Sequence, residues 1–149
     1  MTGMFYEDFT VGDLLEHARG KTVTALENVT ITNMVMNTAQ AHFNVDSRRG
    51  TAFPDILVFG GVTIATVIGL ATEDTAENAV AELGMDGIRL RGPVTHGDSL
   101  YALSEVIATD DGERPDAGVV TFRHWGVNQR DEIVFEGRRR VLIHRRPPT

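Results

Sequence analysis

The feature that most constrains the fold is the segment from Gly61 to Ala71, which carries no charged side chain. A helix that is apolar on every side is expected to be buried on every side. The paired glycines Gly60 and Gly61 at its start let the backbone turn sharply and leave free N–H groups at the N-terminus of the helix. A long buried strand is the competing interpretation because Val and Ile are frequent. The length and the Ala, Gly and Leu content favour the helix.

The segments after this helix favour β-strands. Four are expected, at residues 85–94, 98–109, 117–129 and 132–146, with a polar loop at 110–116 between the second and the third. Pro93 limits how far the first can run as a central strand. Apolar positions in the second alternate up to Ala102 and resume at Val106, which predicts a bulge between these two residues.

The N-terminal half is expected to hold a short strand at 20–25 and then a second helix. Thr24 has the character of an N-cap, and the helix is predicted to run to about Gln40. Its apolar face would consist of Leu26, Ile31, Met34 and Val35. Residues 43–56 are predicted to form an irregular connection. One long helix enclosed by an antiparallel sheet is an α+β arrangement, known as the hot-dog fold. A chain of 149 residues suits one such domain, at 1–149.

Composition and charge exclude several classes of protein. The chain has no cysteine, so disulfide scaffolds, thiolate zinc sites and cysteine nucleophiles are excluded. The net charge of −7 argues against a nucleic-acid-binding protein. No apolar stretch approaches the roughly 20 residues that span a bilayer, and the N-terminus does not resemble a secretory signal. We therefore expect a soluble cytoplasmic protein that binds neither nucleic acid nor membrane.

Four segments, taken in order, resemble the MaoC-like dehydratase family, which includes the R-specific enoyl-CoA hydratases. They are "FYEDFTVGD" (5–13), "TVTALENVTITNMVMNTAQAH" (22–42), "FGGVTIATVI" (59–68) and "GIRLRGPVTHGDSL" (87–100). The resemblance extends over almost the whole chain, and it rests on the order and spacing of the four segments together. It implies a hydro-lyase that adds water to an enoyl-CoA thioester. Coenzyme A would be part of the substrate, and neither a separate cofactor nor a metal ion is expected.

The family's hydratase motif is Asp-x-Asn-Pro-x-His, and this chain departs from it. The histidine of the motif falls on His42, whereas its aspartate falls on Asn37. Asn37 cannot take up a proton, but its amide can orient a water molecule or a hydroxyl group. The form Met-Asn-Thr-x-x-x-His is similar to a subgroup acting on short, branched acyl-CoA compounds, that of mesaconyl-CoA hydratase (β-methylmalyl-CoA dehydratase).

Elimination of water β to a thioester requires a base, an acid and a group that stabilises the enolate oxygen. His42 is expected to act as base or acid, and the N–H groups of Gly61 and Val62 to bind the thioester oxygen. By spacing alone, a partly buried or helix-capping role suits His42 better than catalysis, and the glycine pair is equally a simple turn. Asp46 is a weaker candidate for a substitute carboxylate, and a surface or capping role suits it better.

Arg89 and Arg91 are expected on one side of their strand, where they are weaker candidates for contacts with the phosphates of coenzyme A. Surface solubility explains them equally well.

Two other functions remain open. Hot-dog folds also host thioesterases, but the apolar helix carries no carboxylate before Glu73 to activate water. A non-catalytic acyl-CoA binder or partner subunit is the second alternative, and Asn37 is its best support. Fold alone does not choose among the three functions. Since family members usually pair, so that two sheets join into one, we expect a homodimer or a higher homo-oligomer.

Overall fold

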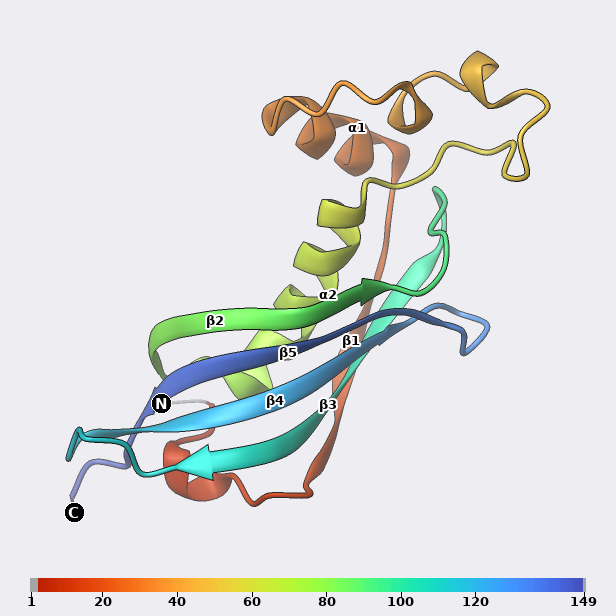
Figure 1. Ribbon diagram of the computed structural model, residues 1–149. Coiled ribbons are helices and arrows are strands. Elements are labelled where there is room, and N and C mark those ends of the chain that lie inside the picture. The colour runs from red at the N-terminus through yellow and green to blue at the C-terminus, as the bar shows by residue number, and fades with distance from the viewer. Residues whose placement is uncertain (1–2, 149) are drawn as a thin grey trace.

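In the computed structural model, which describes residues 3–148, a five-stranded antiparallel sheet curves around one long helix (Figure 1). The sheet order is β1-β3-β4-β5-β2. The strands are β1 (Leu14–Thr22), β2 (Ala79–Leu90), β3 (Ser99–Asp110), β4 (Ala117–Val127) and β5 (Ile133–His144). The helices are α1 (Ala25–Met34) and α2 (Gly60–Thr75), with 3-10 turns at Tyr6–Asp8, Gln40–His42 and Asp46–Arg48. This confirms the predicted α+β hot-dog fold.

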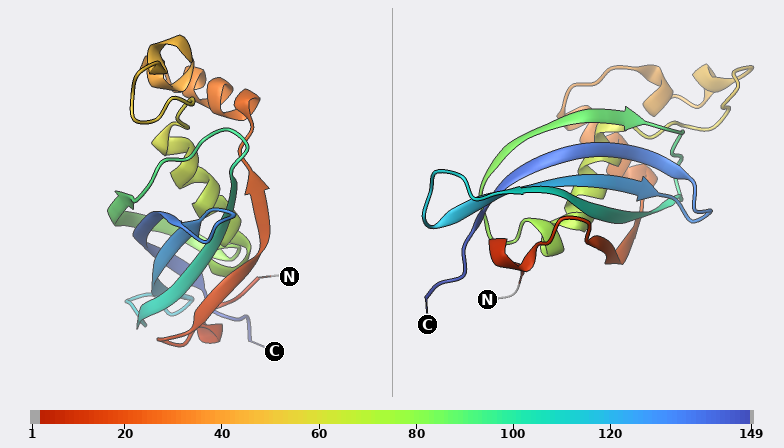
Figure 2. Two further views of the ribbon diagram at one scale, coloured as in Figure 1. Left: turned by 90° about the vertical axis from the view of Figure 1, so that its right-hand side faces the viewer. Right: turned by 60° about the horizontal axis from the view of Figure 1, so that its bottom comes forward.

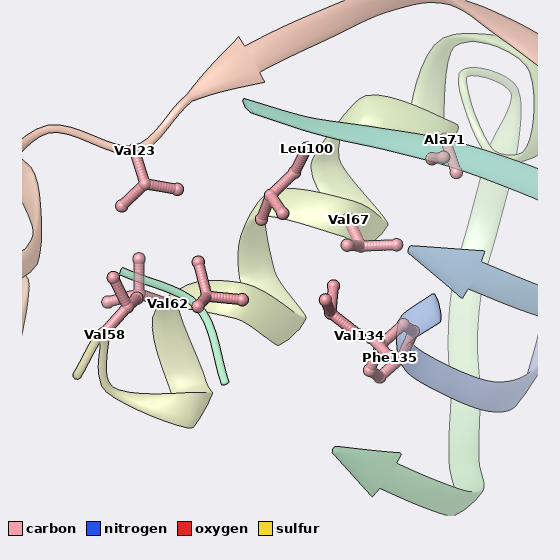
Figure 3. Close-up of a cluster of buried hydrophobic side chains, with 10 residues drawn as sticks. Val23, Val58, Val62, Val67, Ala71, Leu100, Val134 and Phe135 are labelled. Atoms are coloured by element: carbon pink, nitrogen blue, oxygen red, sulfur yellow. The ribbon is translucent and has the colours of Figure 1, made fainter. Parts of the chain in front are cut away.

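Helix α2 lies against the concave face of the sheet and contacts β1, β3, β4 and β5. Figure 3 shows Val62, Val67 and Ala71 of α2 in one buried cluster with Leu100 and Phe135 of the sheet. The expectation that α2 is buried on every side is wrong for the single chain. Ala65, Gly69 and Glu73 are exposed on the opposite face, because the sheet covers only one side of the helix.

The predicted strands are all present, but several boundaries differ. β1 begins at Leu14, well before the predicted start at Gly20. The prediction missed the first part of this exposed edge strand because Glu16 and Arg19 give it little β-propensity. β2 begins at Ala79 rather than Met85 and ends before Pro93, as the proline requires.

The predicted bulge in β3 is also misplaced. Ser104 is buried between Ala102 and Val106, so the inward alternation continues, and the extra residue of β3 in its pairing with β4 lies between Val106 and Ala108. A buried serine on the inward face interrupts the apolar pattern of the sequence without interrupting the strand.

Helix α1 begins as predicted and ends early. Thr24 accepts a hydrogen bond from the Glu27 N–H, and the Glu27 carboxylate accepts one from the Thr24 N–H, a reciprocal capping box. The helix ends at Met34 rather than near Gln40. The chain then turns at Met36 in the left-handed conformation, with φ of 59°, and the N–H groups of residues 36 and 37 bond back to carbonyls of the last helical turn.

The predicted apolar face of α1 is not its buried face. Asn28 and Thr32 are the buried residues of the helix, whereas Leu26 and Met34 are each 77% exposed. Helix α1 and the connection at 35–58 lie beyond one end of the sheet, beside the N-terminus of α2 (Figure 2). Within residues 3–148, neither helix is long and apolar enough to cross a bilayer.

Candidate active site

His42 lies at the end of the 3-10 turn Gln40–His42 and is held by its backbone and by one ring nitrogen. Its Nδ1 lies 2.8 Å from the carbonyl oxygen of Leu57, so Nδ1 carries the proton and donates it. The Leu57 N–H in turn donates to the Ala41 carbonyl at 3.1 Å, which joins the turn to the segment leading into α2. The Nε2 atom keeps its lone pair and has no hydrogen-bond partner within residues 3–148. This half-buried imidazole is therefore oriented as a base.

The start of α2 lies next to this imidazole. The Phe59 ring centroid is 5.7 Å from that of His42, and Phe59 is the N-cap of α2. The Val62 N–H donates to the Phe59 carbonyl at 2.8 Å and is therefore already engaged. Among the described residues the Gly61 N–H has no such acceptor. Of the two N–H groups expected to bind the thioester oxygen, that of Gly61 is the one available. It lies at the N-terminus of α2, where the helix dipole favours negative charge.

Asn37 follows directly after the left-handed residue that ends α1. Its Oδ1 accepts a hydrogen bond from the Ala39 N–H at 3.0 Å, which closes a local turn. No hydrogen bond joins Asn37 to His42 in the described part of the chain, and the Asn37 Nδ2 makes none. The half-buried side chain thus presents an unengaged N–H donor.

The weaker candidates lie outside this group. Asp46 begins the 3-10 turn Asp46–Arg48 and pairs with Arg49 at 2.8 Å; its side chain is 71% exposed. Asp46 therefore lies on the surface, outside the group formed by His42 and the start of α2. Arg91 pairs with Glu136 at 2.7 Å, and Arg89 approaches the same carboxylate at 4.0 Å. Both arginines lie on one side of the strand and share one counter-ion.

Asn28 is a residue that the apolar pattern does not single out. It is fully buried in α1 and hydrogen bonds to the start of α2 and to His96. The signal that could have found it is the spacing of Thr24, Asn28 and Thr32, which repeats every fourth residue along one helix face.

A second polar cluster lies near the C-terminal end of α2. The His17 Nδ1 lies 2.7 Å from the Asp74 carboxylate, and its Nε2 lies 2.7 Å from the hydroxyl oxygen of Ser104. Ser104 in turn lies 2.6 Å from Nδ1 of His124, whose Nε2 is buried without a partner among residues 3–148. Burial, followed by the charges of Arg139 and His17, lowers the pKa of His124 to about 3. His124 is thus held neutral. His17, Ser104 and His124 belong to the core, whereas the Asp74 side chain is 45% exposed.

We expect the free energy of unfolding to fall as the pH drops from 6.5 towards about 3. The unfolded chain protonates His124 in this window whereas the folded chain does not, which contributes a slope of up to about 1.4 kcal/mol per pH unit. Urea unfolding between pH 4 and 7 measures it. His124→Phe should have a shallower slope, and replacing the exposed His144 with asparagine should leave the slope unchanged. Equal slopes in all three proteins would contradict the assignment.

No group of three or more His, Asp or Glu side chains within residues 3–148 is placed to hold a metal ion.

Comparison with known proteins gives one family. A family model described as mesaconyl-CoA hydratase matches residues 16–145. A curated relative, the β-methylmalyl-CoA dehydratase of Chloroflexus aurantiacus, is 30% identical over 98% of this chain and 42% of its own length. The chain therefore spans less than half of that relative.

Two solved structures extend the likeness to the fold. A MaoC domain dehydratase from Chloroflexus aurantiacus superposes with a TM-score of 0.89 at 26% identity, over 97% of this chain and 45% of that one. The MaoC-like dehydratase from Rhodospirillum rubrum gives 0.85 at 26% identity, over 98% of this chain and 100% of that one. One of these relatives is thus much longer than this chain, and the other is of similar length.

Proposed function

The chain belongs to the mesaconyl-CoA hydratase family, and we propose that it catalyses the reversible addition of water to a short, branched enoyl-CoA thioester. One observation carries the proposal: the His42 imidazole, oriented by the Leu57 carbonyl, leaves its Nε2 lone pair free beside the N-terminus of α2. The branched acyl group follows the names of the curated relatives, mesaconyl-CoA hydratase and β-methylmalyl-CoA dehydratase.

In the direction of hydration, the Nε2 of His42 takes a proton from water while the water oxygen bonds to the β-carbon. The negative charge that develops on the thioester oxygen is stabilised by the Gly61 N–H. The Nδ2 of Asn37 donates to the water oxygen and orients it. Protonated His42 then transfers the proton to the α-carbon, so that H and OH are added across the double bond and the histidine is restored.

The partner in this proposal is a second copy of the chain. Large apolar side chains are exposed on α1 and along the edge strand β2; they are Leu26, Met34, Leu83 and Met85. Exposed apolar surfaces of this kind are typical of protein interfaces. Light scattering should give at least twice the 16.3 kDa of the chain. A monomer at micromolar concentration would contradict the pairing.

The function is tested with a panel of enoyl-CoA and hydroxyacyl-CoA thioesters, short and long, branched and straight. Loss of the conjugated enoyl thioester absorbance and release of free thiol are followed in parallel. Hydration without thiol release supports the proposal. Thiol release alone would identify a thioesterase, and binding without turnover would identify an acyl-CoA-binding or partner subunit.

Asn37→Asp is expected to lower kcat about 10-fold, since the carboxylate keeps the acceptor for the Ala39 N–H but loses the donor to the water oxygen. The initial rate of hydration measures the effect. Asn44→Asp, an exposed amide outside the proposed site, is the matched control and should keep the wild-type rate. Higher activity in Asn37→Asp would mean that the amide is a weakened form of the usual acid.

A further inference from the structure

The fully buried carboxamide of Asn28 joins three segments that are distant in the sequence. Its Oδ1 accepts a hydrogen bond from the Phe59 N–H at 3.0 Å. Its Nδ2 donates to Nε2 of His96 at 2.9 Å and, more weakly, to the carbonyl oxygen of His42 at 3.4 Å. One side chain of α1 therefore contacts the start of α2, the loop before β3 and the turn that holds the candidate base.

The orientation of this amide is determined by its partners. Only an oxygen can accept from the Phe59 N–H, so Nδ2 must face His96 and His42. His96 accepts at Nε2 and therefore carries its own proton at Nδ1 when it is neutral. Both N–H groups of Asn28 are thus in use, and its Oδ1 accepts from the Phe59 N–H and, more weakly at 3.5 Å, from the Thr32 hydroxyl. Such a buried network is rigid because every broken bond would leave a desolvated polar group.

The two backbone groups that Asn28 binds are those that determine the geometry of the site. Phe59 precedes the glycine pair that opens α2, so its N–H is anchored close to the Gly61 N–H. The carbonyl of His42 belongs to the residue whose Nε2 is the proposed base. The separation between the base and the oxyanion donor therefore depends on this amide, together with the contacts of Leu57 to Ala41 and His42. Aspartate offers no N–H donor, and leucine offers neither donor nor acceptor.

We infer that Asn28 is a positioning residue that holds the His42 imidazole at a fixed position relative to the N-terminus of α2. The inference rests on the proposed hydratase function. Asn28 itself contacts no substrate. Its contribution is expected in kcat rather than in KM, because a misplaced base and oxyanion donor raise the barrier without changing how coenzyme A is held.

The main test compares Asn28→Asp, which preserves shape and removes both N–H donors, with Thr32→Val as the matched control. The Thr32 hydroxyl is also buried in α1 and donates to the Asn28 backbone carbonyl at 2.6 Å. Asn28→Asp should lower kcat about 30-fold to 100-fold with KM within about 3-fold. Thr32→Val should reduce stability and leave kcat within about 3-fold of the wild type. Equal losses of kcat in the two variants would overturn the inference.

A spectroscopic arm does not depend on turnover. Nitrogen-15 NMR of the histidine side chains should show His96 with its proton on Nδ1 in the wild type and in Thr32→Val. In Asn28→Asp the proton should move to Nε2, where it can donate to the new carboxylate, and the His42 signals should shift. Unchanged His42 signals in folded Asn28→Asp would overturn the inference, whether or not the wild type hydrates any thioester.

If Asn28→Asp does not fold, His96→Ala serves in its place, since it removes one partner of the amide from a half-buried loop position. It should lower kcat about 5-fold at constant KM and shift the His42 signals. An unchanged kcat with unchanged His42 signals would count against the role of Asn28. A wild type without hydratase activity would refute the proposed function, and the NMR arm would then decide the positioning role alone.

Discussion

His42→Ala is expected to lower kcat for enoyl-CoA hydration by about 1,000-fold, in line with the loss of a general acid–base group. The Nε2 of His42 is the proposed acceptor of the proton from water and its donor to the α-carbon. The Leu57 carbonyl accepts a hydrogen bond from Nδ1 and holds the ring in the tautomer that is protonated at Nδ1 and leaves Nε2 free. Since the side chain is only half-buried and its loss removes one hydrogen bond, the variant should lose only about 1 kcal/mol of stability.

Initial rates with the best thioester of the panel measure this effect, with thermal unfolding as the check on folding. His144→Ala is the matched control, because His144 is an exposed histidine at the end of β5. It should retain wild-type kcat. Hydration at an undiminished rate in folded His42→Ala would show that the catalytic base lies elsewhere in the protein.

Gly61→Ala is expected to lower kcat by about 100-fold, since shifts of about 1 Å in catalytic groups have effects of this size. A Cβ added at Gly61 would lie 2.4 Å from Cε1 and 2.6 Å from Cζ of the Phe59 ring. The Phe59 ring would have to move, and its centroid lies only 5.7 Å from that of His42. The methyl group would also occupy space next to the N–H that is proposed to bind the thioester oxygen.

Gly69→Ala is the control in the same helix. An added Cβ at Gly69 meets no atom within 4 Å, and alanine is the better helix former by about 1 kcal/mol. This variant should be more stable than the wild type and equally active. If Gly61→Ala kept the wild-type kcat, the oxyanion role of Gly61 would be wrong, whatever the outcome for His42.

The elements that the sequence predicted well are those determined by local chemistry. Thr24 forms the predicted N-cap, and the structure adds a capping box with Glu27, which depends on a hydroxyl and a carboxylate three residues apart. The apolar run at 61–71 forms the central helix, and Pro93 follows the end of β2. In each case the interaction that decides the conformation lies within a few residues of the chain.

The predictions that failed depended on distant partners. Leu26 and Met34 suggested the buried face of α1, but the buried residues are Asn28 and Thr32. Asn28 is stabilised there by Phe59 and His96, which lie far along the chain. The bulge in β3 was misplaced because Ser104 is buried with His17 and His124. A polar residue is stable in the core only when such partners meet it, and the periodicity of apolar residues does not reveal them.

By itself, the sequence determined the hot-dog fold and the central helix, and it predicted that Asn37 and His42 belong to one motif, because these follow from local patterns and from the resemblance to a family. Only the tertiary structure decided which atoms of that motif are free. The Leu57 carbonyl engages Nδ1 of His42, the Phe59 carbonyl engages the Val62 N–H, and Asn28 connects both regions. The availability of a donor or acceptor depends on hydrogen bonds between segments that meet only when the chain folds.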